Sequence, residues 1–182
     1  MNNATRFAAI AIFASSFVLA ASEAWSQGKY KVKVDTPAAQ TKYTYQHVLD
    51  VGDMPGHQVR MYEIQRTFGE KGPVYRGVRA IEEFNRGQSD MTNGNGRSWG
   101  YSVTVLENGD KIYGQFIGTI WTVEAEAGTK QTTFTGTGTY VGGTGEFKTM
   151  RGTNRSKSQI QMADGKVVSN QTETEGEFWF EK

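Results

Sequence analysis

The sequence has no cysteine, only 3 prolines and no excess of charge of either sign. Without cysteine the chain has no disulfide scaffold, no thiol nucleophile and no zinc-thiolate site. Its 20 Lys and Arg residues nearly balance its 19 Asp and Glu residues. A nucleic-acid-binding surface normally needs a basic excess, so we expect no nucleic-acid partner.

Long apolar runs are also scarce, and the one we find lies at the N-terminus. Residues 7–21 are apolar or small throughout, follow Arg6, and precede small residues at Ala24-Trp25-Ser26. This pattern predicts a secretory signal peptide at 1–26 and a secreted or periplasmic protein. The run is short for a membrane span, so we expect no span after cleavage, and a retained N-terminal anchor is the alternative. The remaining chain of roughly 155 residues is long enough for one hydrophobic core.

Glycine and aromatic residues are abundant, with 22 glycines and 12% aromatics, and they suit tightly turned sheets. We expect a flexible segment at 27–42, a polar loop at 85–96 and no amphipathic helix. Residues 43–182 then form an all-β domain with short turns, which indicates a sandwich or a barrel. The expected strands are 42–51, 57–68, 74–84, 99–106, 111–123, 131–141, 151–162 and 167–180.

The expected strand at 57–68 carries mixed side chains on both faces. One parity contains Val59, Met61, Glu63 and Gln65, and the other contains Tyr62, Ile64 and Phe68. A barrel with a partly polar lumen explains this mixture better than a one-sided sheet. We therefore predict an eight-stranded antiparallel β-barrel.

Two stretches resemble the allene oxide cyclase/dirigent superfamily. The run Val141-Gly142-Gly143-Thr144-Gly145-Glu146-Phe147, followed by Arg151-Gly152, resembles the dirigent signature. Met61-Tyr62-Glu63-Ile64-Gln65-Arg66, leading to Gly72-Pro73, resembles a cyclase motif. The resemblance covers about residues 43–180. It implies an eight-stranded barrel, often a homo-oligomer, that holds a small hydrophobic molecule and acts by positioning it.

The glycine-rich run also has a structural interpretation. Consecutive glycines allow positive φ at a tight corner, and Phe147 then resumes a strand as a core anchor. A phosphate-binding loop is excluded, because no Gly-Lys-Ser/Thr ending and no helix pattern follow. We expect no cofactor.

Glu63 is the first candidate for a functional residue. It shares its parity with Val59 and Met61, so we expect a carboxylate in an apolar lumen, where it is costly unless paired or functional. The resemblance implies that Glu63 stabilises charge in the pocket and that Gln65 occupies the position of the cyclase Asn. It also makes Pro73 the pocket proline. The alternative for Glu63 is a structural salt bridge in the lumen with Arg76 or Arg79.

Other candidates complete the expected site. Tyr101 and Tyr113 join Val59, Met61 and Pro73 as expected ligand-binding residues. Cyclases of this family also carry a cysteine on a later strand, which this chain lacks.

The acidic neighbours Glu82 and Glu83 fall on opposite strand faces and cannot act as a pair.

Two polar clusters are weaker candidates for metal binding. His47, Asp50, Asp53 and His57 surround a Pro-Gly turn, where they are either surface residues or metal ligands. The segment 89–96 lacks the ligand order of a calcium loop. We predict no metal site.

The sequence thus predicts a secreted barrel that binds a small hydrophobic molecule, lipid-like or phenolic. If it is an enzyme, we expect an isomerase of the cyclase kind. A dirigent-like partner in radical coupling, active only with an added oxidant, is a further possibility. The alternative is a non-catalytic structural or interaction barrel whose lumen is filled by its own side chains.

Overall fold

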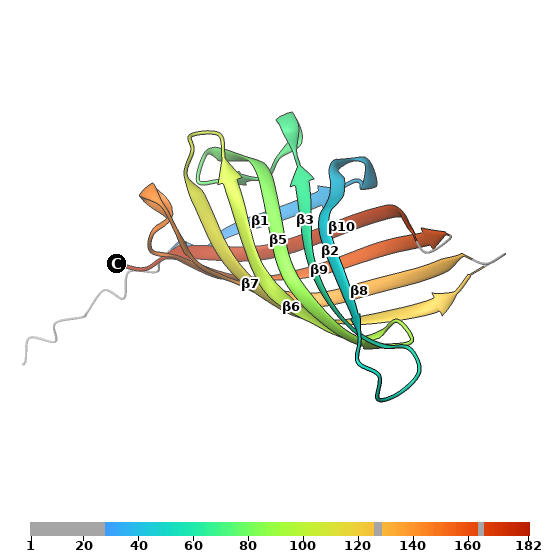
Figure 1. The fold of residues 1–182 in the computed structure, drawn as a ribbon. Helices are drawn as coiled ribbons and strands as arrows, with labels where there is room; N and C mark the ends of the chain where they lie inside the picture. The colour runs from blue at the N-terminus through green and yellow to red at the C-terminus, as the bar shows by residue number, and fades with distance from the viewer. Residues whose placement is uncertain (1–27, 126–128, 164–165) are drawn as a thin grey trace, which may run out of the picture.

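The computed structural model describes residues 28–125, 129–163 and 166–182, and the expected signal peptide at 1–26 lies outside this part of the chain. The described residues form one antiparallel sheet of ten strands (Figure 1). The strands are β1 (Tyr30–Thr36), β2 (Thr41–Asp50), β3 (His57–Thr67), β4 (Val74–Tyr75), β5 (Val78–Thr92), β6 (Asn95–Leu106), β7 (Lys111–Glu124), β8 (Lys130–Gly143), β9 (Met150–Ala163) and β10 (Lys166–Phe180).

The sheet is a meander in which strands that follow each other in sequence mostly pair. Its order is β1-β10-β9-β8-β7-β6-β5-β3-β2, with the short β4 paired to β5 alone. The all-β antiparallel prediction is confirmed, whereas the predicted number of eight strands is wrong. β1 and β2 lie at opposite ends of this order, and no backbone pairing joins them in the described residues.

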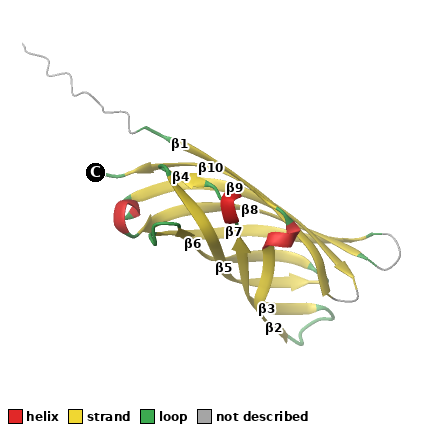
Figure 2. Ribbon diagram, turned by 90° about the horizontal axis from the view of Figure 1, so that it is seen from above, coloured by secondary structure: helices red, strands yellow, loops and turns green. Residues whose placement is uncertain are grey.

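The sheet coils strongly, as sheets with a right-handed strand twist do. Its concave face is visible from above, with short turns of 3₁₀ helix at its rim (Figure 2). Side chains of β2 and β3 reach those of β10 across this face. Arg66 Nη2 donates to Thr172 Oγ1 at 3.3 Å, and Asn170 Nδ2 donates to the Tyr43 hydroxyl at 3.4 Å. These contacts bring the two ends of the sheet close together.

The N-terminal part of the domain differs from the prediction of a flexible segment at 27–42. Residues Tyr30–Thr36 form β1, which pairs with β10 from Phe178 to Thr172. A 3₁₀ turn at Ala38–Gln40 then leads into β2. The alternation in Lys31-Val32-Lys33-Val34 is a strand signal, and it buries Val32 in the core.

The polar segment 85–96, predicted as a loop, instead forms the long hairpin of β5 and β6. The two strands pair from Ala80↔Leu106 to Thr92↔Asn95. Asn93 and Gly94 make the two-residue turn with φ of 53° and 78°. Positive φ at both central residues is the geometry that favours Asn-Gly in hairpins. Polar side chains occur in these strands because one face of the hairpin lines a polar interior.

The strand predicted at 74–84 is interrupted by another tight turn. β4 ends at Tyr75, and Arg76 and Gly77 adopt φ of 50° and 89° before β5 begins. A non-glycine residue such as Arg76 rarely adopts this conformation, so the first residue of the turn does not resemble a turn residue.

The hydrophobic core gathers at one end of the coiled sheet. Its members come from strand ends that the antiparallel register brings together: Val32, Phe68, Tyr75, Ala80, Leu106, Ile112, Tyr140, Phe147, Met150 and Phe178. Aromatic rings dominate it, with the Tyr75 centroid 5.5 Å from that of Phe178 and 6.2 Å from that of Tyr140. The core therefore closes one end of the concave face.

The glycine-rich run forms a folding corner, as predicted. Gly142 and Gly145 have φ of 136° and 52°, which L side chains rarely adopt. Thr144 ties the corner to β7, because its Oγ1 accepts from Lys111 N at 2.8 Å and its N donates to Lys111 O at 2.8 Å. Phe147 is fully buried, which confirms it as a core anchor. However, Gly145–Phe147 is a 3₁₀ turn, and the strand resumes only at Met150.

Candidate ligand-binding cavity

The concave face encloses a cavity of about 1120 Å³. Ligand pockets usually measure about 300–1,000 Å³, so this space suits a whole small molecule. Side chains of β2, β3, β5 and β6 line one wall, and side chains of β1 and of β7 to β10 line the rest. The buried aromatic residues Phe68, Tyr75 and Tyr140 form its floor at the core end.

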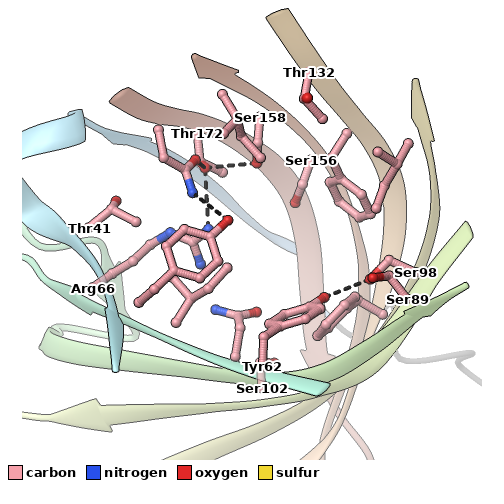
Figure 3. A pocket seen from close by; sticks show the side chains of 18 of the residues that line it. Thr41, Tyr62, Arg66, Ser89, Ser98, Ser102, Thr132, Ser156, Ser158 and Thr172 are labelled. Atoms are coloured by element: carbon pink, nitrogen blue, oxygen red, sulfur yellow. Dashed lines mark hydrogen bonds between the residues drawn. The ribbon is translucent and has the colours of Figure 1, made fainter. Parts of the chain in front are cut away.

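The even-numbered residues of β3 face the cavity, which is the opposite of the expected parity. Gln58, Arg60, Tyr62, Ile64 and Arg66 line it. Figure 3 shows Tyr62 and Arg66 pointing into this space. β3 alternates as predicted, but the face predicted to point inward points outward.

The residues predicted for the site consequently lie elsewhere. None of the following is among the described residues that line the cavity: Glu63, Gln65, Val59, Met61, Pro73, Tyr101 and Tyr113. Met61 and Tyr101 are 57% and 64% exposed on the outer face of the sheet. The structure brings Glu63 and Met61 together on this outer face, since they alternate along one strand.

Glu63 has a partner outside the cavity rather than a place inside it. Its carboxylate accepts from Arg86 Nε at 2.6 Å and from Thr44 Oγ1 at 2.5 Å. The hydrogen bond from Thr44 and then the Arg86 guanidinium lower the pKa of Glu63 below its ordinary value. A salt bridge exists, as the structural alternative expected, but its partner is neither Arg76 nor Arg79.

The carboxylate inside the cavity belongs to Glu83. It pairs with Arg66 Nη1 at 3.0 Å and also accepts from Asn85 Nδ2 at 2.6 Å. The Arg66 side chain is 9% exposed and the Glu83 side chain 25%. Glu82 lies on the other face and accepts from Gln65 at 2.8 Å, which confirms that the two neighbours cannot act together.

Arg60 lacks such a counter-charge. No carboxylate lies within 4.0 Å of it in the described residues, and its Nη2 donates only to Gln58 Oε1 at 2.9 Å. Its Nε is buried and has no hydrogen-bond partner in the described part of the chain, and the same holds for Arg66 Nε and Thr41 Oγ1. Buried polar groups are normally paired, so these three atoms are unusual in a folded protein.

Tyrosine hydroxyls add neutral hydrogen-bonding groups to the same wall. Burial raises the pKa of Tyr43 to about 12, although the positive charge of Arg66 acts in the opposite direction. Burial likewise raises the pKa of Tyr62, whose hydroxyl lies 2.6 Å from Ser98 Oγ. Both phenols therefore stay protonated at neutral pH.

The wall formed by β7, β8 and β9 combines apolar rings with hydroxyl groups. Phe116 and Phe134 pack edge to face with centroids 6.4 Å apart, and Ile120 and Ile160 also line the cavity. Hydroxyls are paired with each other, as in the 2.8 Å contact of Ser158 with Thr172 (Figure 3). The cavity can thus hold an apolar body against this wall while polar groups on β3 orient its polar end.

The side chains of His57, Asp53 and Asp50, considered as metal ligands, contact each other or other side chains. His57 contacts Asp53 at 2.6 Å and Asp90 at 2.9 Å through its two ring nitrogens. Asp50 instead accepts from Gln58 at 2.8 Å. The described residues contain no group of three or more His, Cys, Asp or Glu side chains placed to hold a metal ion.

Sequence reasoning missed Arg60, Arg66 and Glu83. Arg60 and Arg66 share a parity with Tyr62 and Ile64, and Glu83 follows the same alternation on β5. The alternation in the sequence therefore shows that these residues share a face. It does not show that this face points into the cavity, because basic residues usually face solvent.

Comparison with protein-family models, with curated proteins and with solved structures finds no match for this chain. Within residues 28–125, 129–163 and 166–182, no helix is long and apolar enough to cross a membrane.

Proposed function

We propose that this protein binds one small, largely hydrophobic molecule in the cavity on the concave face of its sheet. The observation that carries the proposal is the open cavity of about 1120 Å³ beside a packed core. A protein that used the concave face only for folding would fill it, since interiors pack with few voids larger than water. The mixture of aromatic, aliphatic and hydroxyl side chains is typical of sites that bind small molecules.

The secreted or periplasmic location and the family resemblance belong to this proposal as well. The glycine-rich corner and the coiled antiparallel meander support a relationship to the allene oxide cyclase/dirigent barrels. In such a barrel the sheet of this chain would close between β2 and β1, the two ends of its strand order. Export would make the protein a carrier or a positioning protein outside the cytoplasm. A homo-oligomer and a lipid-like or phenolic ligand are parts of the same proposal.

The protein could also position its ligand for a reaction, and a cyclase-like isomerisation would be such a reaction. This activity requires side chains that face the ligand. Glu63 and Gln65 lie on the outer face, so we do not carry their expected roles into the proposal. Glu83 and Arg66 are the charged pair inside the cavity and would face a bound molecule. The alternative is a non-catalytic interaction domain, which needs no open cavity.

A matched pair of variants on β7 tests cavity binding. Ile120 lines the cavity, whereas Ile117 is 59% exposed on the outer face of the same strand. We expect Ile120→Trp to weaken binding of a fluorescent polyene fatty acid at least about fivefold, because overpacking typically costs about 1–3 kcal/mol. Ile117→Trp makes the same chemical change outside the cavity and should leave the affinity within about twofold.

Equal affinities for the two variants would place the probe outside the cavity and refute the proposal. Circular dichroism of both variants checks that the fold is intact. If the wild type binds no apolar probe of any size, the interaction-domain alternative is favoured.

A further inference from the structure

The charges that line the cavity are unbalanced. Of the described residues around it, four are basic and one is acidic: Lys42, Arg60, Arg66 and Lys130 against Glu83. Lys130 also pairs with Glu124 at 3.2 Å, and Arg66 pairs with Glu83 at 3.0 Å. The cavity nevertheless keeps an excess of positive charge, and Arg60 has no carboxylate to offset it.

Arg60 is held in place without being neutralised. It lies on β3 between Val48 of β2 and Ser89 of β5, in the middle of paired strands. Gln58 holds its Nη2 at 2.9 Å, while its Nε is buried and unpaired in the described residues. An uncompensated cation that is partly removed from water is destabilising, so its presence suggests a partner from outside the chain.

The surroundings of Arg60 also favour an anion. Arg66, the second arginine of β3, is buried with its Nε unpaired, and Tyr43 lies within the field of both arginines. Burial raises the pKa of Tyr43 to about 12, so its phenol remains a neutral hydrogen-bonding group. Guanidinium groups match the geometry of a carboxylate with two parallel hydrogen bonds.

We infer that the ligand is an apolar carboxylic acid whose carboxylate is bound by Arg60 on β3. This inference rests on the proposed function and deepens it by naming the class of ligand. The apolar body then lies against Phe116, Phe134 and Ile120. The acid is either aliphatic or aromatic, since both present the same carboxylate beside an apolar body.

The test compares an acid with its neutral ester in three forms of the protein. The probes are a fluorescent polyene fatty acid and its methyl ester. The proteins are the wild type, Arg60→Met and Arg155→Met. Arg155 is exposed on β9 and does not line the cavity, so its variant removes the same charge elsewhere.

We expect the wild type and Arg155→Met to bind the acid about ten- to hundredfold more tightly than the ester, the range given by charge-assisted hydrogen bonds. In Arg60→Met this preference should fall about tenfold, with the affinity for the ester unchanged. A parallel measurement uses cinnamic acid and its methyl ester. If cinnamic acid binds more tightly than the fatty acid, the apolar body of the ligand is aromatic, and if it binds more weakly, the body is aliphatic.

Two different failures are distinguishable. Equal affinities of the wild type for acid and ester, or a preference of the wild type that Arg60→Met does not reduce, overturn the carboxylate inference and leave cavity binding intact. If neither probe binds the wild type, the proposed function fails and this inference fails with it.

A further measurement needs no variant. Lowering the pH through the pKa of the probe's own carboxyl should reduce wild-type binding of the acid to that of the ester. Binding of the acid that stays equally tight when its carboxyl is protonated contradicts the inference.

Discussion

The ion pair inside the cavity gives a prediction whose magnitude follows from the structure. Arg66 and Glu83 lie 3.0 Å apart with side chains 9% and 25% exposed. Removing one partner of a buried pair typically costs about 3–5 kcal/mol, because the other charge stays uncompensated. Glu83 is partly solvated and Gln can still accept a hydrogen bond, so we expect Glu83→Gln to lose about 2–3 kcal/mol of unfolding free energy.

Urea denaturation followed by circular dichroism measures this loss. With a slope of about 2 kcal/mol/M, the unfolding midpoint of Glu83→Gln should fall by about 1–1.5 M urea. The control is Glu177→Gln, which breaks the exposed pair of Lys29 and Glu177 with side chains 58% and 40% exposed. Exposed pairs contribute about 0–1 kcal/mol, so this variant should unfold near the wild type.

A double variant separates the loss of the pair from the loss of packing. Arg66→Met with Glu83→Leu leaves no unpaired charge, so it should recover most of the stability lost by Glu83→Gln. A loss below about 0.5 kcal/mol for Glu83→Gln, no larger than that of the exposed control, would refute the claim that this pair is held in a low-dielectric interior.

Three further changes test other parts of the fold. The carboxylates of Asp90 and then Asp53 accept hydrogen bonds from the His57 ring and raise its pKa above 6.5, so its stabilisation is complete below pH 6.5 and is lost as pH rises through the raised pKa. Melting temperatures at about pH 6 and pH 8.5 should differ more for the wild type than for His57→Gln, and an equal difference would contradict the assignment. Gly145→Ala puts a Cβ against the Asp110 carboxylate at φ of 52°, so it should cost about 1–3 kcal/mol in urea denaturation. Gly109→Ala, at φ of 86° in open space, should cost less, and the reverse order would be inconsistent with this corner. Phe147→Ala removes a fully buried ring from the core and should cost about 3–5 kcal/mol, whereas a cost below 1 kcal/mol would show that the corner does not anchor the core.

Local signals in the sequence were sufficient for most of the fold. Alternation of side chains predicts β2, β3, β7, β8, β9 and β10 and parts of β5 and β6, and Asn108-Gly109, a pair typical of hairpin turns, links β6 to β7. Asn93-Gly94, between β5 and β6, carries the same signal, but the polar composition of residues 85–96 predicts a loop instead. A polar segment indicates a loop when both faces of the sheet are expected to be apolar. Here the concave face of the sheet is polar, so polar residues also occur within strands.

The face of β3 that points inward could not be predicted from hydropathy. Its outer parity carries Val59 and Met61, and its inner parity carries Arg60 and Arg66. A one-residue shift exchanges the two faces, and hydrophobic contrast normally decides between them. In this protein the apolar residues are divided between both faces, so the decision depends on tertiary packing that no local pattern contains.

Turns are predicted from the sequence where glycine occupies the positions with positive φ. Gly142 and Gly145 were correctly placed at a corner, because consecutive glycines indicate positive φ. The turn at Arg76 has a positive φ on a residue that disfavours it, and it joins the paired strands β4 and β5. The cavity itself depends on the coiling of the whole sheet.

Native mass spectrometry of the chain from Gln27 onward, before and after organic extraction, tests cavity binding most directly. We predict that the protein retains one small apolar molecule, which extraction removes and which a smaller fraction of Ile120→Trp retains. A protein of unchanged mass that takes up no apolar acid after extraction would contradict the account.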